Sequence, residues 1–81
     1  MVKVLLFGRL RDVAGWRERD LDPAPTTLAA LRARIIADTP GLEAALAAPG
    51  VQAAVDRSLV RGDCALEAGA EVAFMPAMSG G

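Results

Sequence analysis

The sequence predicts a small α+β fold in which a mixed sheet of four to five strands carries one main helix across one face, with a short second helix. Two observations predict this fold. Short runs of apolar and β-branched residues lie near both ends of the chain, and between them a longer segment repeats its apolar residues at helical spacing. With 81 residues, 53% of them hydrophobic, the chain is long enough for one domain with a folded core.

Runs of strand-forming residues define the expected sheet. The first run combines valines, leucines and a phenylalanine and ends at Gly8, and the last run has a similar character. A charged run after Gly15 is a weaker candidate, suited to a sheet edge. After Gly50 the residues alternate as in a half-buried strand. We therefore expect strands at residues 2–7, 16–21, 51–56, 58–60 and 71–75.

The main helix is predicted to begin after a proline-rich break. Either Thr26 or Thr27 can cap it, because a threonine hydroxyl oxygen accepts a hydrogen bond from a free backbone N–H group of the first turn. Three apolar residues then recur on one helix face: Leu28, Leu31 and Ile35. We expect the helix to reach about residue 38, before Pro40 and Gly41, and Leu31 to lie in the core.

Shorter segments complete the predicted fold. The alanine-rich residues 42–48 favour a short second helix, and residues 11–15 are typical of one helical turn or a loop ended by glycine. The first and last strands are expected side by side in the middle of the sheet. This arrangement is the β-grasp, or ubiquitin-like, fold. A ferredoxin-like sandwich would need two equal helices and a longer first connection.

Composition argues against several classes of function. The net charge is −1 and no basic run exceeds two residues, so we expect no nucleic-acid partner. Apolar stretches are shorter than the ~20 residues that span a bilayer, and the N-terminus does not look like a signal peptide, so we expect a cytoplasmic protein without a membrane partner. The chain has no histidine and a single cysteine, which disfavours a metal site or a self-contained hydrolase.

The end of the chain is its most informative segment. Residues 1–75 are predicted to form the folded domain, and residues 76–81 a flexible tail without charged side chains. The terminal pair, Gly80 and Gly81, makes a thin segment that accepts nearly any backbone angle. Such a tail can enter a narrow channel and present the Gly81 carboxylate without steric cover. A frayed terminus rich in small residues is the alternative.

Three large apolar residues are predicted to share the sheet face opposite the main helix. Strand alternation places Phe7 and Met75 there, and Leu59 is expected on the same face. Together they would form a patch for a partner, because interface energy concentrates at apolar anchors. Scattered surface residues are the alternative. Four arginines could form an ionic rim or a solvated face: Arg9, Arg11, Arg17 and Arg19. We expect no chemical role for Cys64.

Several segments carry a family resemblance: residues 2–7, 9–15, 27–28, 54–56, 69–76 and 79–81. Along them the sequence resembles the family of molybdopterin synthase small subunits over essentially the whole chain. The ending is the most specific part, and residues 11–15 help to separate this family from the shorter sulfur carriers of the thiamine pathway. Asp56 and Met75 depart from the family, which often has asparagine and a bulkier residue there.

The resemblance implies a sulfur carrier that is not catalytic alone. A ubiquitin-activating-like adenylyltransferase would use ATP to adenylate the Gly81 carboxylate, and sulfur would replace one carboxyl oxygen to give a thiocarboxylate. The tail would then enter the large catalytic subunit, within a heterotetramer, and donate sulfur to cyclic pyranopterin monophosphate to form the molybdopterin dithiolene. No permanently bound cofactor is implied. Besides Gly80, the large subunit would contact Pro76, Met78 and Ser79.

Three other functions would use the same features differently. A thiamine-pathway carrier would share the fold and the terminal thiocarboxylate. A ubiquitin-like modifier would join Gly81 to lysines of other proteins through an isopeptide bond. A plain interaction module would need neither terminal glycine, so blocking the C-terminus would leave its activity intact.

Overall fold

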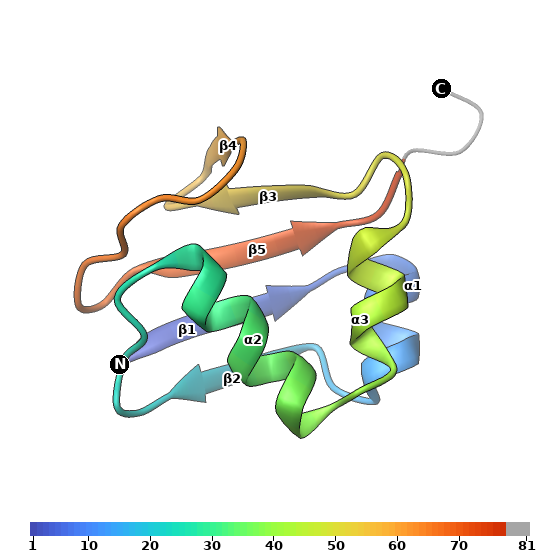
Figure 1. Ribbon diagram of the computed structural model, residues 1–81, viewed down its shortest axis with the longest axis horizontal. Coiled ribbons are helices and arrows are strands. Elements are labelled where there is room, and N and C mark those ends of the chain that lie inside the picture. The colour runs from blue at the N-terminus through green and yellow to red at the C-terminus, as the bar shows by residue number, and fades with distance from the viewer. Residues whose placement is uncertain (78–81) are drawn as a thin grey trace.

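The first and last strands pair in the middle of a five-stranded sheet (Figure 1). The computed structural model describes residues 1–77. Its strands are β1 (Val2–Leu6), β2 (Glu18–Leu21), β3 (Gln52–Val55), β4 (Ser58–Val60) and β5 (Glu71–Met75). Their order in the sheet is β2-β1-β5-β3-β4, and only the β1–β5 pair within it is parallel. The predicted mixed sheet, with the charged β2 at one edge, is therefore confirmed.

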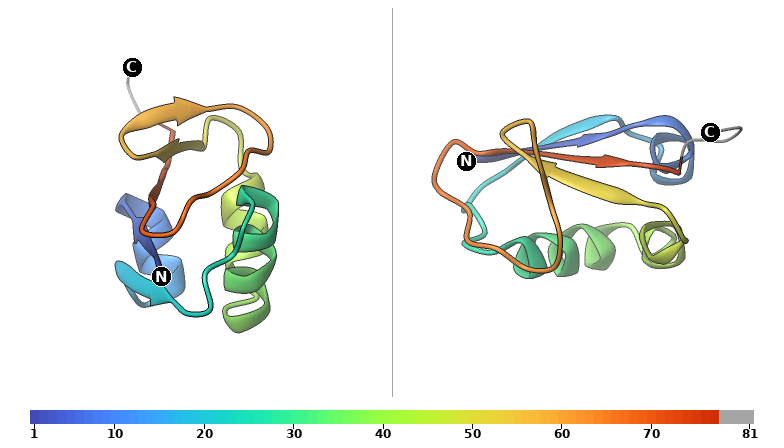
Figure 2. Two further views of the ribbon diagram at one scale, coloured as in Figure 1. Left: turned by 90° about the vertical axis from the view of Figure 1, so that its left-hand side faces the viewer. Right: turned by 90° about the horizontal axis from the view of Figure 1, so that it is seen from above.

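Helices cover one face of this sheet and leave the other open. Helix α2 (Leu28–Asp38) and the shorter α3 (Leu42–Ala47) both lie on the same side of the strands, whereas α1 (Gly8–Ala14) lies at one end of the sheet (Figure 2). No helix within residues 1–77 has both the length and the apolar character needed to cross a bilayer.

Helix α2 begins as its sequence predicts. The Thr27 hydroxyl oxygen accepts a hydrogen bond from the Ala30 backbone N–H at 3.1 Å. The Asp63 carboxylate accepts a second one from the Ala29 N–H at 2.8 Å. These two bonds satisfy backbone N–H groups of the first turn, which have no partner inside a helix. The predicted core residues all face the sheet and are buried: Leu28, Leu31 and Ile35.

Helix α1 is longer than the single turn expected from the sequence. It spans seven residues, and Gly15 ends it in a left-handed conformation while its N–H donates to the Arg11 carbonyl oxygen at 2.9 Å. Leu10 is the only residue of α1 that is fully buried. The apolar residues Leu10, Val13 and Ala14 do recur at helical spacing, but Gly8 is a poor helix former and conceals the first turn in the sequence.

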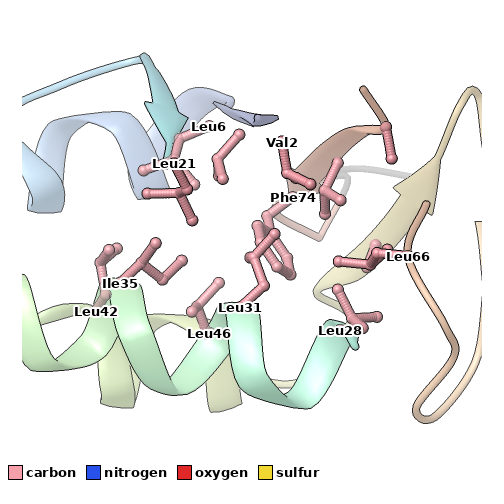
Figure 3. Packing of buried hydrophobic residues seen from close by; sticks show 14 of the residues in the cluster. Val2, Leu6, Leu21, Leu28, Leu31, Ile35, Leu42, Leu46, Leu66 and Phe74 are labelled. Carbon is pink, nitrogen blue, oxygen red and sulfur yellow. The ribbon is translucent and has the colours of Figure 1, made fainter. Parts of the chain in front are cut away.

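The core lies between the helix-facing side of the sheet and the two covering helices (Figure 3). Phe74 from the middle of the sheet is completely buried, and it points toward Leu31 of α2. In the register of the strands, Phe74 pairs with Leu6 on one side and Ala53 on the other. The core contains no buried polar side chain among the described residues. Apolar burial therefore supplies most of the stability of this small domain.

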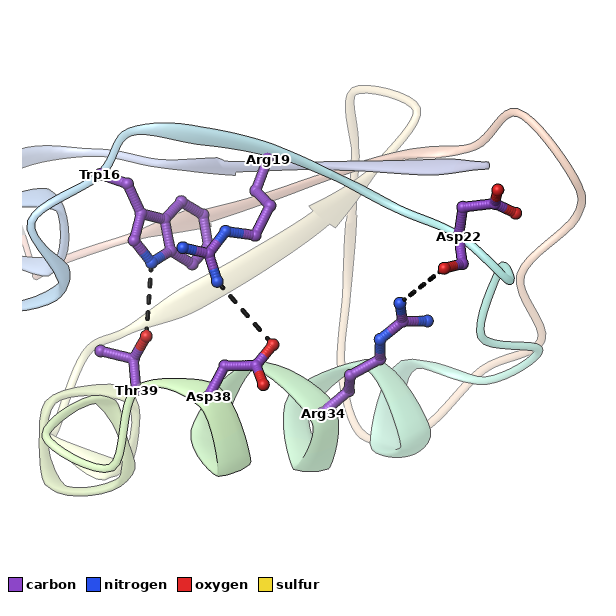
Figure 4. Close-up of polar contacts among 6 residues, drawn as sticks. All are labelled: Trp16, Arg19, Asp22, Arg34, Asp38 and Thr39. Carbon is purple, nitrogen blue, oxygen red and sulfur yellow. Dashed lines mark hydrogen bonds and ion pairs between the residues drawn. The ribbon is translucent and has the colours of Figure 1, made fainter.

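A polar cluster fastens β2 to the end of α2 on the rim of the core (Figure 4). The Trp16 indole Nε1 donates to the Thr39 hydroxyl at 3.4 Å, while the Arg19 guanidinium lies 4.4 Å from the centre of the Trp16 ring and 3.8 Å from the Asp38 carboxylate. Along the same helix, the Arg34 guanidinium donates to the Asp22 carbonyl oxygen at 3.0 Å. Trp16 thus has a packing role, and Arg19 pairs within the chain.

Replacing Leu31 with alanine tests the placement of α2. We expect Leu31→Ala to lower the free energy of unfolding by about 2–5 kcal/mol, because it leaves a cavity against the sheet. Chemical denaturation followed by circular dichroism measures this change. Leu59→Ala is the matched control: Leu59 is 62% exposed, so the same truncation should change stability by less than about 0.5 kcal/mol. Equal effects of the two substitutions would contradict the placement.

Candidate functional site

The three predicted patch residues lie on the sheet face that the helices leave open. Phe7 is 48% exposed and Leu59 is 62% exposed, whereas Met75 is half-buried. All three line one shallow hollow. We call this surface the apolar patch. Its role in binding stays a prediction, but the shared location is a property of the fold.

The floor of the patch contains residues that sequence reasoning missed, two of them small alanines. Leu5, Ala73 and Ala54 also line the hollow. In the strand register Leu5 pairs with Ala73, Ala73 with Ala54, and Ala54 with Leu59, so these side chains form one row across four strands. Two alanines in the middle of the row make a depression between larger side chains. The signal in the sequence is the alternation of alanine with Val72 and Phe74 in the last strand.

Phe7 reaches the patch because backbone pairing continues past the end of β1. The Phe7 N–H donates to the Phe74 carbonyl oxygen at 3.2 Å. Phe7 is extended, with φ −117° and ψ 153°, and α1 begins only at the next residue. The side chain therefore points away from buried Leu6, as strand alternation requires.

The turn between β3 and β4 supplies a charged side chain beside the patch. Asp56 and Arg57 have φ angles of 48° and 71°, as in the two-residue hairpin turn whose central residues are both left-handed. The Asp56 N–H donates to the Glu71 carbonyl oxygen at 2.8 Å, and the Glu71 N–H donates to the Asp56 carboxylate at 3.0 Å. These bonds hold the turn against β5. Arg57 and Glu71 line the same hollow as the apolar patch.

The C-terminal segment begins directly beside the patch. Met75 is the last residue of β5, and Pro76 cannot continue the hydrogen-bonded ladder because proline has no N–H. Pro76 is half-buried and Ala77 is exposed. The other predicted tail residues lie outside the described part of the chain: Met78, Ser79, Gly80 and Gly81. Their roles and the predicted domain boundary after residue 75 stay predictions.

Cys64 occupies a structural position. It is half-buried against the core, its carbonyl oxygen accepts from the Leu28 N–H at 2.9 Å, and its own N–H donates to the Asp63 carboxylate at 2.9 Å. These bonds attach the segment before β5 to the start of α2. Within residues 1–77, no three histidine, cysteine or carboxylate side chains gather in a way that could hold a metal ion.

Comparison with known proteins gives matches along the whole chain. The model of the ThiS family matches residues 4–81. The chain is 36% identical to the molybdopterin synthase sulfur carrier subunit of Escherichia coli K12 over 81 residues, which is the full length of both proteins.

Two solved structures of similar fold are archaeal proteins. The crystal structure of SAMP1 from Haloferax volcanii has a TM-score of 0.80 at 25% identity, covering 99% of this chain and 98% of that chain. The solution structure of small archaeal modifier protein 1 from Methanosarcina acetivorans has a TM-score of 0.86 at 21% identity, covering 99% and 95%. These neighbours confirm the predicted ubiquitin-like β-grasp fold.

Replacing Arg57 with glycine tests the strain in the turn. We expect Arg57→Gly to raise the free energy of unfolding by about 0.5–1 kcal/mol, because a left-handed conformation costs a side chain roughly 1–2 kcal/mol and costs glycine almost nothing. Thermal and urea unfolding measure this gain. The control is Arg61→Gly, at an exposed arginine outside the left-handed region, which should lower stability by increasing the freedom of the unfolded chain. A loss of stability in Arg57→Gly would contradict the prediction.

Proposed function

Because the chain belongs to the ThiS family, we propose that it carries sulfur on its C-terminal residue, Gly81, as the small subunit of a cytoplasmic molybdopterin synthase. The observation that carries this proposal is the full-length match to a sulfur carrier subunit at 36% identity. The family match extends through Gly81 itself, so it includes the group that would carry the sulfur.

Loading would proceed in two steps at the terminal carboxylate. A carboxylate oxygen of Gly81 attacks the α-phosphorus of ATP, which releases pyrophosphate and leaves an acyl-adenylate. A hydrosulfide ion (HS⁻) then attacks the acyl carbon, the carbon–oxygen bond to AMP breaks, and AMP leaves with that oxygen. The product is a thiocarboxylate in which one oxygen has been replaced by sulfur. The first step makes the carboxylate oxygen a good leaving group, which an unactivated carboxylate is not.

The side chains of this protein indicate which chemical groups it would supply and which its partners would supply. The sequence has no histidine, the commonest general base. A thiocarboxylate sulfur is itself a nucleophile and needs no base beside it. The chain would therefore contribute the acyl group and its sulfur. The ubiquitin-activating-like adenylyltransferase would contribute the nucleotide site, and the large subunit the pocket for cyclic pyranopterin monophosphate.

The apolar patch is the proposed docking surface for the large subunit. Phe7 and Leu59 are large apolar side chains left exposed, the kind of anchor on which interface energy concentrates. Met75 joins the patch to Pro76, so a subunit seated on the patch would meet the tail where it leaves the sheet. Assembly into a heterotetramer would follow if each large subunit binds a second copy of itself.

A protein modifier is the second candidate function, favoured by the likeness to SAMP1 of Haloferax volcanii at 25% identity. It would use the same activated carboxylate but pass it to a lysine amine, forming an isopeptide bond. Intact mass separates the two: a carrier gains one sulfur for one oxygen, and a modifier appears attached to another protein. A thiamine-pathway carrier would show the same change in mass as a molybdopterin synthase subunit. Deleting the gene separates these two carriers, because it shows which cofactor the cell can no longer make.

Changes at the terminus test the proposed chemistry. We expect one residue added after Gly81 to abolish sulfur loading, because it moves the carboxylate by about 3.3–3.6 Å. Gly80→Val should also fail, because a β-branched side chain thickens and stiffens the segment. The measurement is intact mass after incubation with the activating enzyme, ATP and a sulfur donor. Cys64→Ala is the control and should load normally. Loading of the extended chain, or loss of loading in the control, would refute the proposal.

A charge in the apolar patch tests the docking surface. We expect Leu59→Lys to weaken binding to the large subunit by at least about tenfold, because the new ammonium loses water at the contact. Isothermal titration calorimetry measures the affinity. Ala33→Lys adds the same charge at an exposed position of α2, on the covered side of the sheet, and should bind as the parent does. Equal affinities for both variants would exclude the patch as the interface.

A further inference from the structure

The chain leaves the sheet between two glycines that belong to neighbouring connections. Gly8 follows β1 and Gly50 precedes β3, and these two strands flank β5 in the sheet. The end of β5 therefore lies between the two connections, beside α1 and α3 (Figure 1). Pro76 and Ala77, the first two residues after β5, contact one glycine each.

Both contacts are so close that a side chain at either glycine position would force the passing chain to shift. A Cβ atom on Gly8 would lie 2.9 Å from Cγ of Pro76. A Cβ atom on Gly50 would lie 2.6 Å from Cβ of Ala77 and 3.4 Å from its Cα. Carbon atoms without a bond between them favour separations of about 3.5–4.0 Å, so a methyl group at Gly50 would displace Ala77 by roughly 1 Å.

Other glycines of the fold show that the close approach of the chain is independent of a left-handed backbone conformation. Gly69 has φ 86°, almost the same as the 85° of Gly50, but nothing lies within 4 Å of where its Cβ would be. Gly15 and Gly62 are also left-handed and equally open. At these three positions the backbone angle alone explains the glycine. At Gly8 and Gly50 the close approach of Pro76 and Ala77 is a second reason for glycine.

We propose that Gly8 and Gly50 are positioning residues that set the place and direction in which the C-terminal segment leaves the sheet. We call this pair the exit collar. The inference rests on the proposed function, in which the exit collar would aim the Gly81 carboxylate at the sites of the partners. Neither glycine touches the reacting atoms.

Limited reach makes the starting point of the segment important. Gly81 is four residues beyond Ala77, so its carboxylate extends at most about 13–14 Å from there. Any displacement of Ala77 shortens the distance that the Gly81 carboxylate can reach or changes the direction in which it points. A 1 Å misplacement at a reacting centre costs up to about a hundredfold in rate. Because four residues can absorb part of the shift, we expect a smaller loss, about tenfold.

The decisive experiment compares two equivalent substitutions and a rescue. Gly50→Ala and Gly69→Ala carry the same backbone strain, so both should lower the thermal midpoint, Gly50→Ala by at least as much because its methyl group also meets Ala77. We expect Gly50→Ala alone to lower the rate of sulfur loading by about tenfold, per folded molecule. The double variant Gly50→Ala/Ala77→Gly removes the opposing methyl group and should restore the rate while keeping the lowered midpoint. Gly8→Ala with Pro76→Ala provides the same test on the other side.

Three results would overturn the collar. These are loading of Gly50→Ala as fast as Gly69→Ala, no recovery of the rate with Ala77→Gly, and a wild-type NMR spectrum without a nuclear Overhauser contact between Gly50 and the Ala77 methyl group. The last measurement does not depend on loading. If the wild type shows that contact but accepts no sulfur, the proposed function fails and the collar remains.

Discussion

Parallel pairing of the first and last strands is the constraint on which the other features of this protein depend. β1 and β5 lie side by side through four residue pairs, from Lys3 with Glu71 to Leu6 with Phe74. This pairing puts Phe74 in the centre of the core and brings Phe7 beside Met75. It joins residues about seventy positions apart, so neither the core nor the apolar patch exists until nearly the whole chain has assembled.

Alternation along those strands gives the sheet two different faces. The helix-facing side presents Val72 and Phe74 to α2 and α3, which bury them completely. The open side presents Ala73 between Leu5 and Ala54, and the two alanines create a hollow that larger side chains surround. Substitutions on the open face therefore change an exposed surface without creating a cavity in the core.

The same topology places the chain end in the middle of the sheet rather than at an edge. β5 has a hydrogen-bonded neighbour on each side, so the segment that follows it passes between the connections of both neighbours. Proline at position 76 stops the ladder, and glycine at positions 8 and 50 leaves room for the chain to pass. The C-terminal segment thus has a defined origin on the sheet.

The sequence by itself determined the elements whose pattern is local. Apolar spacing in α2, the Thr27 cap, the alternation in β5 and the terminal Gly80-Gly81 pair can all be read from residues close together in the chain. The tertiary structure decided what depends on distant residues. The alanine floor of the patch and the exit collar each arise where segments far apart in sequence meet. The physical reason is that a local pattern records which face of an element is buried, whereas a contact between Gly50 and Ala77 exists only once strand order and register have brought them together.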